Sequence, residues 1–402
     1  MLSVTEARAR IIAALPGMPS ETVPLTAAAG RVLAEDVAAR RTQPPFDVSA
    51  MDGWACRQAD LACIPAILKP VGAAAAGGRH DGRIGPGDCV RIFTGAPIPD
   101  GADAIVIQED ADLAGDRLTV REAPKPGQWI RKAGLDFAEG QVLLKTGTVL
   151  SPPDVGLAAA MNVPWLAVRR KPRIAVLATG DELARPGEPI GPNQIVSSNN
   201  IALCALIEAN GGVAVDLGIA RDTEDDLRAK AAAAAGCDLL LTLGGASVGE
   251  HDLIHKILGG GGAGIDFWKI AMRPGKPLMF GRADLDKLGN VPLLGLPGNP
   301  VSALVCGYNF LLPAMRAMLG LDWEIRFEIA VAGAALVEND RREDYLRATL
   351  TQESDRLVAT AFSRQDSSML RRLSEADCLI VRPPLAPAVA AGASVPILRL
   401  RR

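Results

Sequence analysis

Between residues 171 and 322, short apolar runs alternate with segments whose apolar spacing is typical of helices. Segments 199–210 and 223–235 have the helical pattern, and a further helix is expected to begin at Asn299 and Pro300. The apolar runs occupy residues 174–178, 213–217, 239–243 and 292–296. Strands that alternate with helices form a mostly parallel sheet with helices on both faces. The sequence therefore predicts a central, doubly wound, mostly parallel α/β domain.

The run at 239–243 ends at a glycine pair, and the residues that follow predict a ligand site. Gly244 and Gly245 permit a positive φ and lack the Cβ atoms that would keep a ligand away from the backbone. Ser247 and Gly249 come next, and the free N–H groups of a helix that starts here would favour an anion. This segment is the first candidate for the protein's chemistry.

Carboxylates stand close behind the strand ends, which predicts a cation beside the anion. Glu250 and Asp252 follow the glycine pair, and Mg²⁺ suits sites in which every ligand is oxygen. Glu182 and Asp222 occupy similar positions after two other strands. Two interpretations stay open for Glu182, Asp222 and Asp252. They are ligands of Mg²⁺ and a phosphate, or they are acids that stabilise helix starts, with Asp222 capping the helix at 223–235.

Three elaborated strand ends would face one crevice if their strands are neighbours. They lie at 179–182 (Thr-Gly-Asp-Glu), at 244–252 and at 297–300 (Pro-Gly-Asn-Pro). In doubly wound sheets, ligands bind at the carboxyl ends of the strands. Any one of these segments is explained by a turn before a capped helix, but three together favour a ligand pocket.

A basic, proline-rich loop is the third candidate feature. Lys269, Arg273 and Lys276 lie within eight residues, close to Pro277. Surface solubility would account for three such cations. The rigid setting favours an oxyanion site instead, in which arginine binds in a bidentate manner and lysine acts as a point charge.

The rest of the chain predicts three further domains. Helical patterns at 3–15, at 22–40 with Thr26 as cap, and from Ser151 to about Met161 indicate a helical linking domain. Short β-like runs among Gly, Pro and Asp indicate a β-rich domain, and the last segment shows strand patterns only. The predicted domains are 1–41 plus 138–170 (helical), 42–137 (β-rich), 171–322 (α/β) and 323–402 (all-β).

Composition excludes several classes of protein. A net charge of −3 argues against nucleic-acid binding, and three histidines make a zinc site improbable. The seven cysteines are scattered without a C-x-x-C pair, which indicates reduced thiols in the cytoplasm. Charges at the N-terminus do not fit a signal peptide. Residues 291–315 carry no charge, but prolines and glycines there predict a buried strand, turn and helix rather than a membrane span.

Six motifs give the chain a resemblance to the MoeA family of molybdopterin molybdenumtransferases, which is related to the E domain of gephyrin. They occur in family order and together extend over essentially the whole chain. The motifs are at 49–55 (Ser-Ala-Met-Asp-Gly-Trp-Ala), 91–103 (beginning Arg-Ile-Phe-Thr-Gly-Ala-Pro), 179–183, 244–252, 267–277 and 296–302.

The resemblance implies an elongated homodimer and a molybdenum insertase. In the implied reaction, adenylylated molybdopterin and molybdate are the substrates, Mg²⁺ is required and AMP is released. The active cleft is expected between the α/β domain of one subunit and the β-rich domain of the other. Molybdopterin adenylyltransferase and the maturation factors of molybdoenzymes are the implied partners, and no nucleic acid or membrane is expected.

The resemblance also assigns roles to residues. Asp52 and Thr94 would come from the partner's β-rich domain, where Asp136 matches another family acid. Glu182, Asp222 and Asp252 would bind metal or substrate. The pterin or phosphate would be held by Gly244, Gly245, Ser247 and Gly249, and by the strand-end residues Pro297, Gly298, Asn299, Pro300 and Ser302. Lys269, Arg273, Lys276 and Pro277 match a basic loop for molybdate or phosphate, and Arg347 and Ser367 match positions tied to the oxyanion.

This chain departs from the family pattern at a few positions without losing a reactive group. Arg273 stands where many members have lysine, and Trp54 replaces a common tyrosine. Ala246 replaces a common valine, and Glu250-His251 stands where Asp-Tyr is frequent.

Two rival functions are less compatible with the sequence. Molybdopterin adenylylation needs the α/β unit alone, and a receptor-anchoring scaffold like gephyrin would be tested by binding to a receptor-loop peptide.

Overall fold

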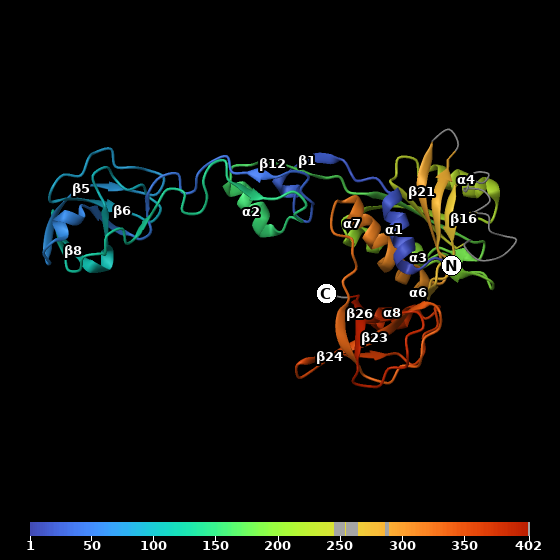
Figure 1. The fold of residues 1–402 in the computed structure, drawn as a ribbon. Helices are drawn as coiled ribbons and strands as arrows, with labels where there is room; N and C mark the ends of the chain where they lie inside the picture. Colours follow the sequence, from blue (N-terminus) through green and yellow to red (C-terminus); the bar gives the residue numbers. More distant parts are fainter. Residues whose placement is uncertain (245–253, 255–263, 286–288, 401–402) are drawn as a thin grey trace. The chain divides into compact units, whose positions relative to one another are not determined.

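The computed structural model describes residues 1–244, 254, 264–285 and 289–400 (Figure 1). It divides into two compact units, one of Met1–Glu21 with Arg169–Arg402 and one of Thr22–Val168. The chain passes from one unit to the other within β1 (Ser20–Pro24) and at the end of β12 (Trp165–Arg169). Each unit is described by itself.

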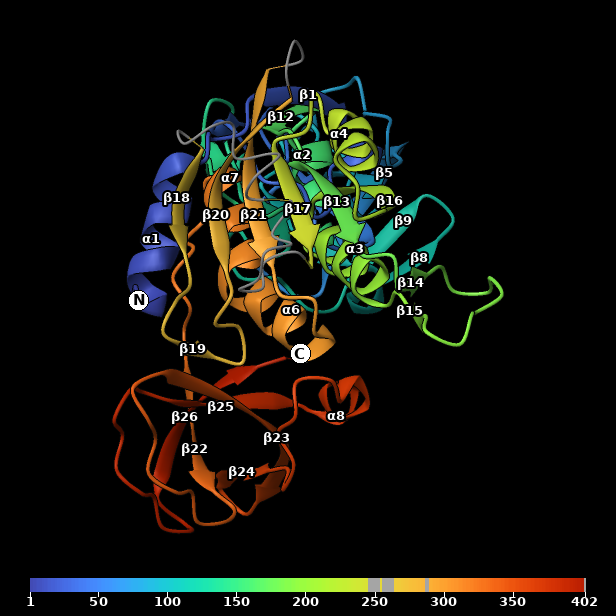
Figure 2. The same cartoon turned by 90° about the vertical axis from the view of Figure 1, so that its right-hand side faces the viewer.

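The larger unit contains the predicted α/β sheet, with strand order β16-β13-β17-β21-β20-β18. The first four strands are parallel, whereas β20 and β18 join the edge in antiparallel pairs. Figure 2 shows these strands side by side. Their bounds are β13 Arg173–Thr179, β16 Val213–Ala220, β17 Leu239–Leu243, β18 Ile265–Trp268, β20 Met279–Asp284 and β21 Asn290–Leu296. The mostly parallel, doubly wound prediction is confirmed.

Helices cover both faces of this sheet because alternate side chains of its strands enter two different cores. Ile174, Val176 and Ala178 pack into one core, and Ala175 and Leu177 pack into the other, as the two-residue period of a strand requires. The helices of the first core are α1 (Val4–Ala14), α3 (Asn199–Ala209), α6 (Pro300–Cys306), the π-helical segment η6 (Gly307–Leu311) and α7 (Leu312–Met318). Helix α4 (Glu224–Ala232) belongs to the second.

The segment Pro300–Met318 is the one helical stretch in the described part of the chain that is long and apolar enough to span a membrane. Its most apolar window is 72% buried within the protein. Phe310, Leu311 and Met315 belong to the first core. The segment thus packs as the buried helix that the sequence predicts after the turn at 297–300.

The C-terminal strands form a separate six-stranded sheet in the same unit, in the order β19-β23-β24-β22-β26-β25. Strand β25 also pairs with β23, so five of these strands close a ring. The bounds are β19 Met272–Arg273, β22 Glu328–Ala332, β23 Glu343–Glu353, β24 Arg356–Ala361, β25 Cys378–Arg382 and β26 Ser394–Arg399. The segment from 323 on was expected to be all-β, but it also contains the short helix α8 (Leu370–Glu375).

The smaller unit is built mainly of strands, as predicted for residues 42–137. Its six-stranded sheet has the order β7-β4-β6-β5-β9-β8. The bounds are β4 Gly53–Cys56, β5 Ala66–Ala74, β6 Asp88–Ile92, β7 Ala104–Ile107, β8 Ala111–Ala114 and β9 Arg117–Val120. Short elements complete both units: β2 Val37–Ala38, β3 Val48–Ser49, β10 Ile130–Arg131, β11 Val142–Leu144, β14 Leu183–Ala184, β15 Ile195–Val196, η1 Leu25–Ala27, η2 Gln58–Leu61 and η3 Gln108–Asp110.

One predicted helix is wrong. Residues 22–40 form the end of β1, the turn η1 and the strand β2, so Thr26 lies within a 3-10 turn and caps no α-helix. The backbone of this segment is bound to a distant part of the unit: Gly30 N–H donates to Leu150 O and Leu33 N–H donates to Thr148 O. These non-local bonds replace the local ones of a helix.

The other predicted helix of this unit is confirmed as α2 (Pro152–Ala160). Ser151 precedes two prolines that suit the first turn, and its backbone N–H donates to Asp154 at 2.8 Å in a capping box.

Candidate functional site

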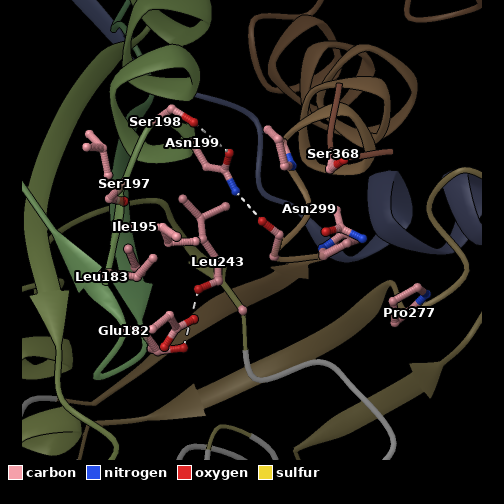
Figure 3. A pocket seen from close by; sticks show the side chains of 17 residues that line it. Glu182, Leu183, Ile195, Ser197, Ser198, Asn199, Leu243, Pro277, Asn299 and Ser368 are labelled. Atoms are coloured by element: carbon pink, nitrogen blue, oxygen red, sulfur yellow. Dashed lines mark hydrogen bonds between the residues drawn. The ribbon is translucent and has the colours of Figure 1, made fainter. Parts of the chain in front are cut away.

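A cavity of about 570 Å³ opens at the carboxyl ends of β13, β17 and β21, where a doubly wound sheet binds its ligands (Figure 3). All three predicted strand ends contribute to its wall. The lining residues are Ala178, Thr179, Glu182, Leu183, Ile195, Val196, Ser197, Ser198, Asn199, Leu243, Gly244, Pro277, Pro297, Gly298, Asn299, Pro300 and Ser368.

Hydrogen bonds between neighbouring strand ends shape the floor of the cavity. Thr179 Oγ1 donates to Leu243 O at 3.3 Å, and Gly244 N–H donates to Leu296 O at 3.3 Å. Gly244 has φ = 91°, and a Cβ there would lie 2.9 Å from Thr179 O. Only glycine fits this position, because a side chain would strike the backbone of the neighbouring strand β13.

The wall beside α3 consists of residues that sequence reasoning did not single out. Asn199 Nδ2 donates to Gly298 O at 2.6 Å and so ties the start of α3 to the turn after β21 (Figure 3). Ser197 and Ser198 add hydroxyl groups. The sequence signal for these residues is the Ser-Ser-Asn-Asn run, because serine and asparagine are preferred at the N-termini of helices.

The predicted acids have separate positions. Glu182 lines the cavity. Asp222 does not line it; its N–H donates to Asp181 Oδ1 at 3.3 Å, and Asp181 N–H donates to Asp222 Oδ2 at 3.4 Å. Thr223, rather than Asp222, caps α4, because its side chain accepts from Asp226 N–H. The capping interpretation of Asp222 is therefore wrong.

Among the residues that the structure describes, no three His, Cys, Asp or Glu side chains lie together in a way that could hold a metal ion. Asp252, Gly245, Ser247 and Gly249 lie outside the described residues. The donors that do line the cavity are carboxylate, hydroxyl, amide and backbone oxygens. These oxygen ligands suit Mg²⁺, and among the described residues Glu182 is the carboxylate that lines the cavity.

The residues of the basic loop lie in different surroundings and do not form one group. Pro277 lines the cavity. Lys269 has a positive φ of 77° and places its ammonium over the Trp268 ring, 4.4 Å from the ring centre. Lys276 is exposed. Arg273 is bound within the C-terminal sheet, where it donates to both carboxylate oxygens of Asp344 and to Asp340 Oδ2 at 3.1 Å.

The C-terminal segment reaches the cavity through Ser367 and Ser368. Asn299 Nδ2 donates to Ser367 Oγ at 3.0 Å, and Val301 N–H donates to Ser367 O at 3.1 Å. Asn299 precedes α6 as predicted, yet its side chain makes no capping bond. Ser368 lines the cavity directly, and Ser302 is buried in α6.

Arg347 is almost fully buried, with 1% of its surface exposed. Its Nε donates to Gln365 Oε1 at 3.1 Å and its Nη1 donates to Met369 O at 3.2 Å. Its Nη2 is buried without a partner in the described part of the chain. Burial lowers the pKa of this guanidinium.

The smaller unit places Asp52 and Thr94 side by side, at the start of β4 and just after β6. Thr94 donates to Asp52 Oδ1 from its backbone N–H at 2.7 Å and from its hydroxyl at 2.8 Å. These two bonds, the backbone bond first, lower the pKa of the Asp52 carboxyl. Asp136 is exposed in the same unit, and its N–H donates to Gln43 O at 3.0 Å.

Comparison with known families divides the chain into three matched regions. Residues 2–162 match the MoeA N-terminal region (domain I and II). Residues 175–317 match a probable molybdopterin binding domain, and residues 330–400 match the MoeA C-terminal region (domain IV).

Individual relatives match over nearly the full chain. Molybdopterin molybdenumtransferase 2 of Mycobacterium tuberculosis is 37% identical over 387 residues, 94% of each protein. Molybdopterin molybdenumtransferase of Haemophilus influenzae is 36% identical over 404 residues, 99% of this chain and 98% of the relative. The crystal structure of the molybdopterin biosynthesis moea protein from Pyrococcus horikosii has 28% identity and a TM-score of 0.85 over 100% of both chains.

Proposed function

The chain belongs to the MoeA family, and from this premise we propose that it is a molybdenum insertase, a transferase of molybdenum cofactor biosynthesis. Its substrates are molybdate and adenylylated molybdopterin, and its products are AMP and the molybdenum-loaded pterin. The observation that carries the proposal is the cavity at the carboxyl ends of β13, β17 and β21, to which all three predicted strand ends contribute.

The proposed reaction conserves the oxidation state of molybdenum. Both dithiolene sulfurs bond to molybdenum, and one oxo group leaves as water with the two thiol protons. Water then attacks the pyrophosphate, the P–O bond to the adenylyl group breaks, and AMP leaves. The chain's task is to hold two anions close together and to position the attacking water.

Residues of the cavity divide this task. Gly244 lies on the floor of the cavity, and Asn199 and Asn299 offer amide groups on its wall. Glu182, with Asp252 beyond the described residues, would hold Mg²⁺, which supplies positive charge to offset the phosphate oxygens. Ser368 offers a hydroxyl group to molybdate at the wall supplied by the C-terminal segment. Arg347, which the resemblance ties to the oxyanion, is buried and does not line the cavity.

The proposal assigns Asp52 and Thr94 to the same reaction through a second subunit. Asp52 is held as an oriented, ionised carboxylate by Thr94, which suits a group that positions a nucleophile or accepts a proton. A homodimer with shared sites follows from the family resemblance. We further expect a cytoplasmic enzyme, and all seven cysteines are free thiols in keeping with this.

The test is AMP release from adenylylated molybdopterin, measured with molybdate or tungstate and with or without Mg²⁺. Glu182→Gln should lower turnover about 100-fold because a ligand group in the cavity loses its charge. Glu324→Gln, at an exposed site in the same unit, is the matched control and should keep wild-type turnover. Wild-type protein that releases no AMP, or a Glu182→Gln variant with full turnover, would contradict the proposal.

A further inference from the structure

We propose that Arg91 is a positioning residue for Asp52, and that Trp54 and Phe93 hold Arg91 in place for this purpose. This inference rests on the proposed function, in which the Asp52 carboxylate takes part in the reaction. None of the sequence motifs discussed above gives Arg91 a role.

The position of Arg91 follows from the pairing of β4 with β6. Trp54 and Arg91 face each other in the antiparallel register. The guanidinium carbon of Arg91 lies 5.3 Å from the centre of the Trp54 ring and 5.1 Å from the centre of the Phe93 ring. Arginine is attracted to the faces of aromatic rings. Two rings therefore restrain one guanidinium on the surface of the sheet.

A third contact fixes the direction of the guanidinium and links it to Asp52. Arg91 Nη2 donates to Gln108 Oε1 at 2.7 Å. The backbone N–H of Gln108 donates to Asp52 O at 3.1 Å. Gln108 thus holds the side chain of Arg91 and the backbone of Asp52 at once.

Arg91 acts on Asp52 without neutralising it in a direct contact. Both bonds from Thr94 reach Oδ1, and Oδ2 takes part in neither of them. Arg91 and Asp52 form no ion pair in the part of the chain that the structure describes, yet the charge of Arg91 helps to lower the pKa of the Asp52 carboxyl. The carboxylate is held ionised while Oδ2 stays available to a substrate or water.

The aromatic neighbours show why this chain suits the role. Trp54 is buried, with 6% of its surface exposed, whereas Phe93 is 37% exposed. Tryptophan attracts cations more strongly than tyrosine, which is common at position 54 in the family. We infer that Trp54 strengthens the restraint on Arg91, so a smaller aromatic ring should keep most of the function and an aliphatic side chain should not.

The experiment compares Arg91→Gln, Arg91→Lys, Trp54→Tyr and Trp54→Leu in the full-length protein, with Arg117→Gln on the exposed end of β9 as control. Two measurements are made on each. Steady-state kinetics give kcat and KM for AMP release. Carbon-13 NMR of labelled aspartate carboxyls follows the titration of Asp52, and the Asp52→Asn variant identifies its signal. Among the described residues, Arg91 is the charged side chain that acts on this carboxylate.

We expect Arg91→Gln to lower kcat about 10-fold with little change in KM, and to raise the titration midpoint of Asp52. Arg91→Lys should recover the midpoint better than kcat, because it keeps the charge and loses the planar stack. Trp54→Tyr should resemble the wild type. Trp54→Leu should lower kcat as Arg91→Gln does, but it should raise the Asp52 midpoint less, because the charge of Arg91 remains.

An unchanged Asp52 midpoint in Arg91→Gln would overturn the inference, and so would an unchanged kcat. A lower melting temperature with neither effect would show that Arg91 serves packing only. A wild-type protein without turnover would contradict the proposed function instead, and the NMR titration would still report whether Arg91 acts on Asp52.

Discussion

Asp52 and Asp344 each lie beside an arginine, but the two regions use their carboxylates differently. Asp344 accepts bonds from Arg273 on both oxygens, and its side chain is only 5% exposed. Asp52 receives two bonds on Oδ1 from Thr94, while Arg91 is held back on aromatic rings. Both oxygens of the Asp344 carboxylate are bonded within the protein. The Asp52 carboxylate is oriented through one oxygen, which leaves the other for a substrate or water. The comparison separates an acid that holds the fold together from one suited to chemistry.

The same contrast explains what the basic loop contributes. Arg273 joins β19 to the neighbouring strand β23, whose Asp344 lies opposite it in the parallel register. The ion pair with Asp344 raises the pKa of the Arg273 guanidinium. For Arg273 to bind an oxyanion in the bidentate manner that the sequence predicts, it would have to release one of its present partners, which use four of its five N–H donors. Pro277, four residues later, lines the cavity instead.

The largest effect should come from Asp52→Asn. This change keeps the shape of the side chain and removes its charge, so AMP release should fall about 100-fold or more. The melting temperature should stay close to that of the wild type, because Asp52 makes its bonds at the surface. Turnover above a tenth of the wild-type rate would place Asp52 with the structural acids.

Asp344→Asn should show the opposite pattern. Asp344 is nearly buried and loses its charge while its partner Arg273 is 45% exposed, so the free energy of unfolding should fall by about 2 kcal/mol, roughly a 30-fold change in the unfolding equilibrium. Thermal unfolding measures this. The exposed pair of Arg10 with Glu6 is the control, and Glu6→Gln should cost less than about 0.5 kcal/mol. Equal losses in the two variants would refute the distinction.

Thr94→Val tests whether orientation of Asp52 matters. The variant keeps the backbone bond and loses the hydroxyl bond, so turnover should fall about 10-fold, the value of one hydrogen bond to a charged group. Thr94→Ser retains the hydroxyl and should recover most of the activity. If valine and serine behave alike in kinetics, the hydroxyl does not orient the carboxylate.

The smallest effect concerns acid stability at Asp340. Hydrogen bonds from Arg342 and the charge of Arg273 lower the pKa of this exposed carboxyl to about 2. Since the unfolded value is about 3.9, its contribution to stability is complete above that pH and is lost as the pH falls through about 2. The melting temperatures of the wild type and Asp340→Asn should therefore converge between about pH 4 and pH 2. A constant difference would contradict the assignment.

The strands and helices of the α/β unit were predictable because their apolar periodicity is strong. The run at 239–243 became β17 with the same limits, and the three strand ends meet at one cavity. The segment 22–40 has a helix-like pattern but forms strands and turns, since its backbone binds to residues 148–150 far along the chain. Local spacing contains no signal for such pairing.

The candidate site was predictable in its residue types and only partly in its contacts. Local backbone geometry requires glycine at 244 and the turn at 297–300, and residue types such as glycine and proline reveal this geometry in the sequence. The pairing of Arg273 with Asp344 joins residues 71 positions apart, and that of Asp181 with Asp222 joins residues 41 apart. Such partners are chosen by the tertiary fold, so the sequence could not show which charges remain available.

The central claim is that one active site combines the α/β cavity of one subunit with Asp52 of another. Co-expression of Asp52→Asn and Glu182→Gln chains with different tags tests it directly. Random pairing makes about half of the dimers mixed, and each mixed dimer has one site with both residues intact, so about a quarter of the wild-type AMP release should return. If both residues act within one chain, no pairing restores a site, and co-expressed protein as inactive as either variant would contradict the claim.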